Sequence, residues 1–144
     1  MVNILAQKNS LMNLFISELR DKEIQKDSMR FRRNMERIGE IFAYEISKQL
    51  DYKQIDITTP LGTSSMSLPQ SKIVNATILR AGLPFHNGFL NYFDQAENAF
   101  ISAHRKYHKD GSFTIQFEHL SSPEISGKTL ILSDPMLASG ASME

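Results

Sequence analysis

The spacing of apolar residues predicts two helices in the first third of the chain. Over residues 10–21 apolar side chains recur near one helical face, and Ser10 is a suitable N-terminal cap. A longer apolar stripe, beginning at Phe31, extends over residues 28–50, and most charged residues of this segment fall outside it. Because such a stripe must be buried against another element, we expect the second helix to contribute to the core.

Beyond Tyr52 the period changes to the alternation typical of strands. Apolar and polar residues alternate over residues 54–58 and again over residues 66–68, with turn-forming residues between them, which predicts a β-hairpin. The following run, residues 72–79, is more continuously apolar, as expected of a strand that is covered on both faces.

Helical and extended segments alternate in the rest of the chain. Residues 84–94 have helical character, with phenylalanines four residues apart that we expect in the core. Further strands are predicted over residues 99–103, 113–118 and 128–133. Strands that alternate with helices favour an α/β fold with a mainly parallel sheet.

Composition narrows the class of protein. The chain has 144 residues, of which 41% are apolar and 22% charged, which is ordinary for one globular domain. Sixteen basic residues balance sixteen acidic ones, which argues against a general nucleic-acid binder. The absence of cysteine excludes disulfides and thiolate chemistry. No apolar run approaches the roughly 20 residues of a membrane span, so we expect a cytoplasmic protein without a membrane partner.

Candidate chemistry lies at the carboxyl ends of three predicted strands, where ligands of open α/β sheets bind. Arg80 follows the apolar strand in an Arg-Ala-Gly-Leu turn, and Arg105 lies close after the strand over residues 99–103. The third strand leads into Asp134 and then into small residues, whose backbone amides can approach and bind an anion. Together these features are typical of a receptor for a molecule phosphorylated at two places. The alternative is that the arginines are solvated charges and the small residues form an ordinary strand-to-helix turn.

Histidines offer weaker candidates. His104 and His108 are four residues apart, but they flank a predicted strand and turn, so we expect no metal site formed by the protein. His86 is expected near the rim of the anion site.

Three motifs resemble the uracil phosphoribosyltransferase family. They are Ile-Leu-Arg-Ala-Gly-Leu-Pro at residues 78–84, the arginine at position 105, and Ile-Ser-Gly-Lys-Thr-Leu-Ile-Leu-Ser-Asp-Pro-Met-Leu-Ala-Ser-Gly-Ala-Ser at residues 125–142. Ser139 stands where the family typically has Thr, and Ala141 where it has Gly. Upstream similarity at Leu-Arg-Asp-Lys-Glu, Phe-Arg-Arg and Tyr-Glu extends the resemblance over nearly the whole chain.

The resemblance implies a phosphoribosyltransferase-type fold, with a mainly parallel sheet flanked by helices and a β-hairpin. It implies transfer of phosphoribose from 5-phosphoribosyl 1-diphosphate (PRPP), bound as its Mg²⁺ complex, to uracil, giving UMP and diphosphate. Asp134 and Arg105 would be catalytic, and Arg80 would bind the diphosphate group. The remaining PRPP-binding residues would be Pro135, Met136, Leu137, Ala138, Ser139, Gly140, Ala141 and Ser142. The resemblance also implies a cis peptide near Arg80 and Ala81.

The same resemblance also implies which partners the protein has and how much of the domain the chain covers. It implies a homodimer or larger homo-oligomer and GTP as a candidate effector. Because the chain ends just after the small-residue loop, we expect residues 1–144 to be the N-terminal portion of one incomplete phosphoribosyltransferase domain, inactive alone. Two alternatives stay open: a non-catalytic, phosphoribosyltransferase-like regulator that binds nucleotide or RNA, and a helical interaction module.

Overall fold

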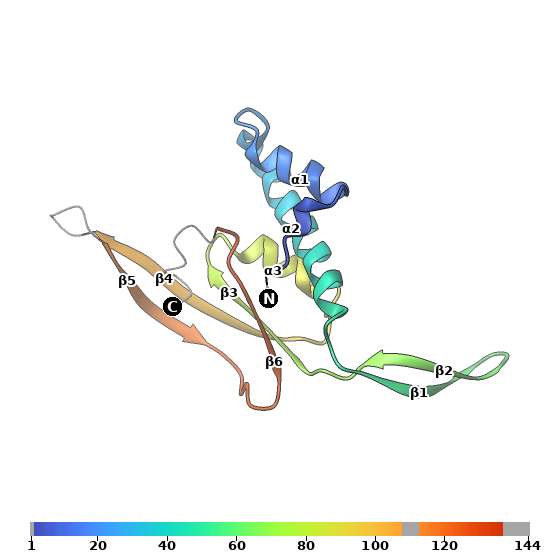
Figure 1. Ribbon diagram of the computed structural model, residues 1–144. Coiled ribbons are helices and arrows are strands. Elements are labelled where there is room, and N and C mark those ends of the chain that lie inside the picture. The colour runs from blue at the N-terminus through green and yellow to red at the C-terminus, as the bar shows by residue number, and fades with distance from the viewer. Residues whose placement is uncertain (1, 108–112, 137–144) are drawn as a thin grey trace.

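The computed structural model describes residues 2–107 and 113–136 (Figure 1). Three helices, two 3₁₀ turns and six strands make up this part of the chain. In chain order they are η1 (Leu5–Gln7), α1 (Leu11–Arg20), η2 (Ile24–Lys26), α2 (Ser28–Ser47), β1 (Tyr52–Thr59), β2 (Gly62–Pro69), β3 (Ile73–Leu79), α3 (Leu83–Leu90), β4 (Glu97–Tyr107), β5 (Phe113–Ser121) and β6 (Thr129–Ser133).

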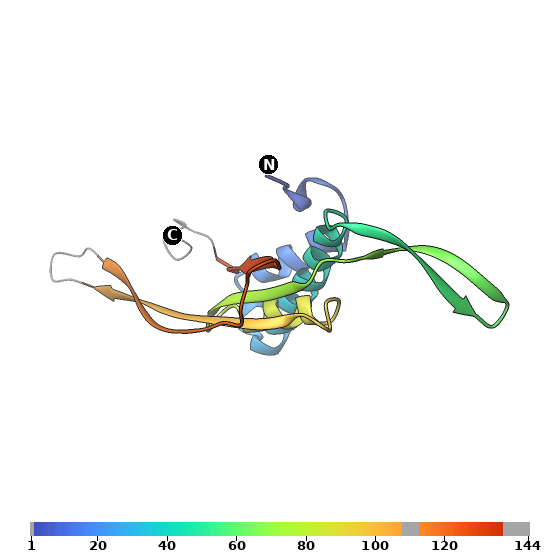
Figure 2. The same ribbon diagram turned by 90° about the horizontal axis from the view of Figure 1, so that it is seen from below.

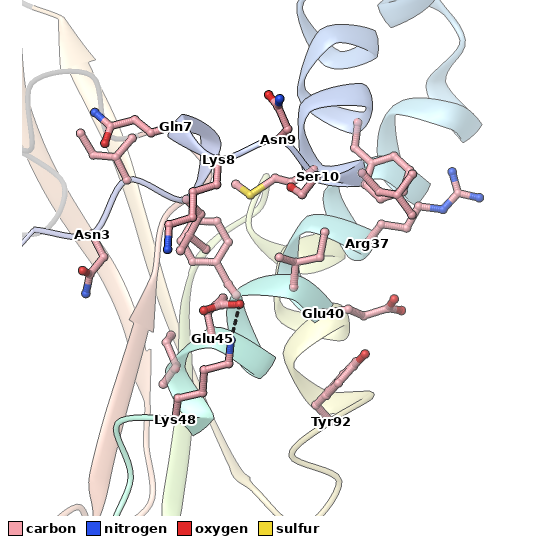
Figure 3. A pocket seen from close by; sticks show the side chains of 18 of the residues that line it. Asn3, Gln7, Lys8, Asn9, Ser10, Arg37, Glu40, Glu45, Lys48 and Tyr92 are labelled. Atoms are coloured by element: carbon pink, nitrogen blue, oxygen red, sulfur yellow. Dashed lines mark hydrogen bonds and ion pairs between the residues drawn. The ribbon is translucent and has the colours of Figure 1, made fainter.

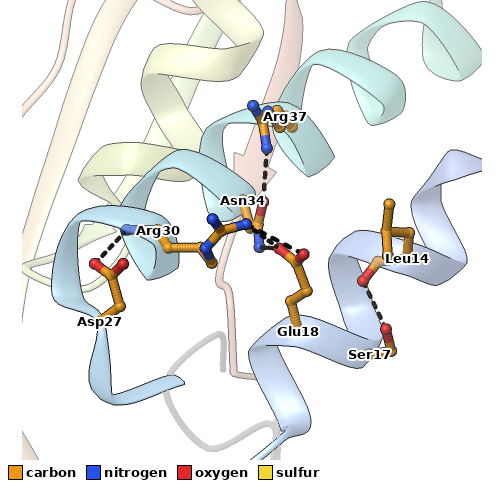
Figure 4. A network of polar contacts seen from close by, with 7 residues as sticks. All are labelled: Leu14, Ser17, Glu18, Asp27, Arg30, Asn34 and Arg37. Carbon is orange, nitrogen blue, oxygen red and sulfur yellow. Dashed lines mark hydrogen bonds and ion pairs between the residues drawn. The ribbon is translucent and has the colours of Figure 1, made fainter. Parts of the chain in front are cut away.

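The helices α1 and α2 are held together by a polar network at their contact (Figure 4). The Asn34 side chain is fully buried, donates to Glu18 Oε2 at 2.6 Å and accepts from Arg37 at 3.1 Å. The hydrogen bond from Asn34, helped by Arg30, lowers the pKa of Glu18. At the start of α2, the Asp27 carboxylate accepts from the backbone N–H groups of residues 29 and 30 and so caps the helix.

The main apolar cluster lies where these helices meet α3 and the sheet. It contains residues from all three helices and from β6: Met12, Met35, Ile38, Ala43, Phe85, Phe89 and Ile131. The phenylalanines of α3 are therefore core residues, as their spacing predicts.

The sheet has four strands in the order β5-β4-β3-β6. Both β4 and β6 are parallel to β3, and β5 returns antiparallel beside β4. The central strand β3 is buried on both faces over residues 74–78, which confirms the prediction from its continuous apolar run. The mainly parallel α/β fold is confirmed.

The predicted β-hairpin is also present, as a separate two-stranded sheet of β1 and β2. It projects away from the helices and the main sheet, as the two views in Figures 1 and 2 show. Within the described ranges, no helix is long and apolar enough to cross a membrane.

Candidate functional site

The ends of β3 and β6 bring two of the predicted site residues to one edge of the sheet. Thr77 of β3 is paired with Ser133 of β6. Arg80 follows the last residue of β3, and Asp134 directly follows β6. Because the two strands are adjacent and parallel, the turns that carry Arg80 and Asp134 leave the sheet side by side (Figure 1).

The turn after β3 is short and leads straight into α3. The Gly82 N–H donates to the Ile78 carbonyl at 3.3 Å, and the Leu83 N–H donates to the Arg80 carbonyl at 3.3 Å. The Leu79–Arg80 peptide is cis, one bond earlier than the resemblance suggests. Arg80 is exposed, and its side chain has no hydrogen bond or ion pair to any residue that the structure describes. A free guanidinium at this edge is available to an anionic ligand.

The turn after β6 begins with a half-buried acid. The Asp134 carboxylate accepts from the Met136 N–H at 3.0 Å, which fixes the side chain against its own backbone. Pro135 is half-buried, and Met136 is 77% exposed. The other predicted PRPP-binding residues of this loop lie outside the described residues: Leu137, Ala138, Ser139, Gly140, Ala141 and Ser142.

Two buried hydroxyl groups lie just before these turns and link β3 to β6, and neither belongs to a predicted site residue. Thr77 Oγ1 donates to the Ser133 carbonyl at 3.2 Å, and Ser133 Oγ donates to the Ala76 carbonyl at 3.0 Å. Both side chains are buried. Their signal in the sequence is a hydroxyl residue near the end of an apolar strand, just before each candidate turn.

Arg105 lies inside a strand rather than after one, which corrects the prediction that this strand ends at Ala103. β4 continues to Tyr107, and Arg105 is paired with Ile115 of β5. Ser102 is the last β4 residue paired with β3, so Arg105 lies three residues, about 10 Å of strand, beyond that contact.

A register shift lies where the pairing of β4 with β3 ends and β4 continues paired with β5 alone. It falls between Ser102, which is paired with His119, and Ala103, which is paired with Phe117, so Glu118 is the extra residue of a bulge in β5. Its carboxylate accepts from the Ser102 hydroxyl at 3.0 Å. Bulges bend and twist a strand pair. The part of the β4–β5 pair that carries Arg105 therefore begins at a bend, where the pairing of β4 with β3 ends.

His86 is not at the rim of the site, which corrects another prediction. Its side chain is 1% exposed; Nε2 lies 2.7 Å from Asn98 Oδ1, and the ring contacts Phe100. Burial lowers the pKa of His86, and the hydrogen bond to Asn98 opposes that shift only in part. We therefore assign His86 to the packing of α3 on the sheet and to no role in the site.

A groove of about 1210 Å³ lies elsewhere, between the N-terminal segment, α1 and α2 (Figure 3). Its walls combine apolar side chains such as Phe15 and Phe42 with charged ones, including a Lys48–Glu45 ion pair of 2.7 Å. None of its lining residues comes from the turns after β3 and β6. The groove is therefore separate from the candidate site.

Comparison with known proteins decides the family. A model of the uracil phosphoribosyltransferase family matches residues 6–144. A uracil phosphoribosyltransferase from Porphyromonas gingivalis is 59% identical over 97% of this chain and 65% of its own length. A second, from Methanothermobacter thermautotrophicus, is 37% identical over 81% of this chain and 54% of its own length.

The chain belongs to the uracil phosphoribosyltransferase family. It spans 65% of the length of its Porphyromonas gingivalis relative. A solved structure, of the AQ2163 protein from Aquifex aeolicus, matches 99% of the chain and 65% of that protein, with a TM-score of 0.81 and 23% identity. That likeness supports the fold. Arg80 and Asp134 lie in turns that follow adjacent parallel strands at one edge of the sheet.

Proposed function

We propose that the complete protein containing this chain transfers the phosphoribosyl group of PRPP to uracil and so recycles the free base to UMP. The observation that carries the proposal is the adjacency of the turns bearing Arg80 and Asp134, in a chain 59% identical to a uracil phosphoribosyltransferase over 97% of its length. A free cationic side chain and an acid held against its own backbone lie at the edge where α/β sheets bind ligands.

The reaction breaks the bond between the anomeric carbon of PRPP and its diphosphate oxygen and forms a bond from that carbon to N1 of uracil. The N1 proton is released, and diphosphate leaves with the electron pair of the broken bond. Positive charge develops on the ribose and negative charge on the diphosphate in the transition state. Groups that meet these charges as they grow lower the barrier as well as binding substrate.

Each predicted residue has a role in that scheme. Arg80 and Arg105 would bind and stabilise the leaving diphosphate, together with the Mg²⁺ that arrives with PRPP. Asp134 would hold the ribose hydroxyls and favour positive charge on the sugar. The backbone amides of the loop from Leu137 to Ser142 would hold the 5′-phosphate. No covalent intermediate on the protein is needed.

The direct test is UMP formation by the complete protein, read to its natural stop codon, from uracil and Mg²⁺-PRPP. Formation of UMP and diphosphate in equal amounts is expected, with cytosine and hypoxanthine as control bases. Binding of nucleotide or RNA without UMP formation would instead indicate the non-catalytic regulator. For the 144-residue polypeptide alone we propose no UMP formation, since it spans 65% of its relative; turnover by that polypeptide would refute this.

We also propose that the protein is a homodimer or larger homo-oligomer, and the β1–β2 hairpin supports this. Residues paired across an antiparallel ladder share a face, which places Ile55 opposite Met66 and Lys53 opposite Leu68. This apolar face projects from the body, with Met66 46% exposed and Leu61, at the tip, fully exposed. A lone two-stranded hairpin is marginally stable in water. A second copy of the chain would cover it.

Sedimentation of single variants tests the oligomer. Met66→Lys places a charge on the apolar face and should dissociate the oligomer, whereas Ser65→Lys, on the opposite face of the same strand, should not. A monomeric parent protein, or identical behaviour of the two variants, would contradict the proposal. The effector proposal, which has the family resemblance as its support, is tested by measuring UMP formation with and without GTP.

A further inference from the structure

Thr77 contacts both turns of the candidate site from within the core. Its side chain is fully buried, and Oγ1 donates to the Ser133 carbonyl at 3.2 Å. That carbonyl belongs to the same peptide group as the backbone nitrogen of Asp134. The Thr77 hydroxyl therefore fixes the orientation of the peptide from which Asp134 leaves the sheet.

The turn that carries Arg80 is packed closely against the same Thr77 side chain. Gly82 is packed so closely that a Cβ there would collide with Thr77 Oγ1 and would lie 2.6 Å from the Ile78 carbonyl oxygen. Gly82 follows Arg80 by two residues and is tied back to Ile78 by its own N–H. The path of the turn that carries Arg80 is thus set by contact with Thr77.

We propose that Thr77 is a positioning residue that fixes Arg80 and Asp134 relative to each other, so that both reach one PRPP molecule. This inference rests on the proposed function. A buried hydroxyl with a single acceptor is costly to lose, because the acceptor is left without a partner in a dry environment. Without that bond the Ser133–Asp134 peptide is free to rotate, and a small displacement of a binding group weakens binding and slows reaction.

The test compares variants of Thr77 in the complete protein. Thr77→Val keeps the shape and removes the hydroxyl, and Thr77→Ala removes the hydroxyl without adding bulk beside Gly82. Thr77→Ser retains the hydroxyl and is the rescue variant. Ile38→Val, which shortens a buried side chain in the helical cluster, controls for a general loss of stability.

The first measurement is the Kd for Mg²⁺-PRPP by calorimetry, with KM values for PRPP and uracil. Thr77→Val and Thr77→Ala should each raise the Kd and the KM for PRPP about tenfold and leave the KM for uracil unchanged. Thr77→Ser, which retains the hydroxyl, should have wild-type values. Wild-type PRPP affinity in both Thr77→Val and Thr77→Ala would overturn the inference. An equal loss of PRPP affinity in Thr77→Ser and Thr77→Ala would overturn it as well. So would an equal loss in Ile38→Val.

The second measurement is amide hydrogen exchange at Gly82 and Met136, whose N–H groups report on the two turns. Both amides should exchange faster in Thr77→Val and Thr77→Ala than in the wild-type protein. In Thr77→Ser both should exchange at the wild-type rate. Faster exchange at one turn alone would show that Thr77 does not couple them. If wild-type protein fails to bind PRPP, the proposed function is wrong, and exchange alone still decides whether Thr77 joins the turns.

Discussion

Gly39 of α2 and Gly88 of α3 lie face to face where the two helices cross. A Cβ at Gly88 would collide with the Glu36 carbonyl oxygen and would lie 2.9 Å from the Gly39 Cα. Main chain touches main chain here, so neither helix can give way by moving a side chain. The crossing matters for function because α3 begins three residues after Arg80.

Gly88→Ala should therefore destabilise the protein by about 1–3 kcal/mol, the usual cost of overpacking. A loss of stability would distinguish close helix contact from free space at this position. Where space is free, alanine is favoured over glycine inside a helix by roughly 1 kcal/mol. Urea denaturation measures the effect. Asn87→Ala, exposed on the same helix, is the matched control and should be neutral or slightly stabilising. Equal stability of the two variants would refute close helix contact.

The free energy of unfolding should decrease as the pH falls from about 6.5 toward the lower pKa that His86 has in the folded protein. Burial lowers the pKa of His86, so the unfolded chain binds a proton near its ordinary pKa of about 6.5 while the folded protein resists it. The contribution is complete above that pH and is lost as pH falls, by at most about 1.4 kcal/mol per pH unit.

His86→Gln should flatten this dependence, measured by urea denaturation from pH 7.5 to 5.5. His119→Gln changes an exposed histidine and should leave the wild-type slope. The lowered pKa of Glu18 acts at more acidic pH, outside this range. An unchanged slope in His86→Gln would show that the native fold does not resist protonation there.

Arg105→Ala should lower kcat for UMP formation roughly 100-fold, the usual effect of removing one charge-stabilising donor. The thermal midpoint should change little, because Arg105 lies where β4 is paired with β5 alone, beyond the contact with β3. Lys22→Ala, at an exposed position between α1 and η2, is the control for loss of one positive charge. Unchanged kinetics in Arg105→Ala would remove Arg105 from the mechanism.

The sequence predicts the elements whose burial has a simple period. The apolar run of β3, the stripe of α2 and the hairpin alternation all correspond to elements in the structure. In α2 and β3 the local pattern agrees with burial in the tertiary structure, and in the hairpin it agrees with the backbone pairing of β1 and β2. That Arg80 and Asp134 lie at one edge of the sheet could also be predicted, because the carboxyl ends of parallel strands in one sheet lie at the same edge.

Other features depend on pairing and packing that local pattern does not record. The polar residues after Ala103 lack the alternation of a covered strand; backbone pairing with β5 extends β4 through Arg105. α3 is packed against both α2 and β3, so neighbouring residues such as Phe85 and His86 are both buried, which a one-sided helix would not allow. The role of Thr77 needs the β3–β6 register and the close approach of Gly82.

The most direct test of the PRPP site is the Kd of the complete protein for Mg²⁺-PRPP, measured by calorimetry without uracil. Arg80→Ala and Asp134→Asn should each raise the Kd about tenfold or more, as expected for loss of a charge-assisted hydrogen bond, while both variants unfold at wild-type urea concentrations. Wild-type affinity in both folded variants would contradict a PRPP site at the ends of β3 and β6.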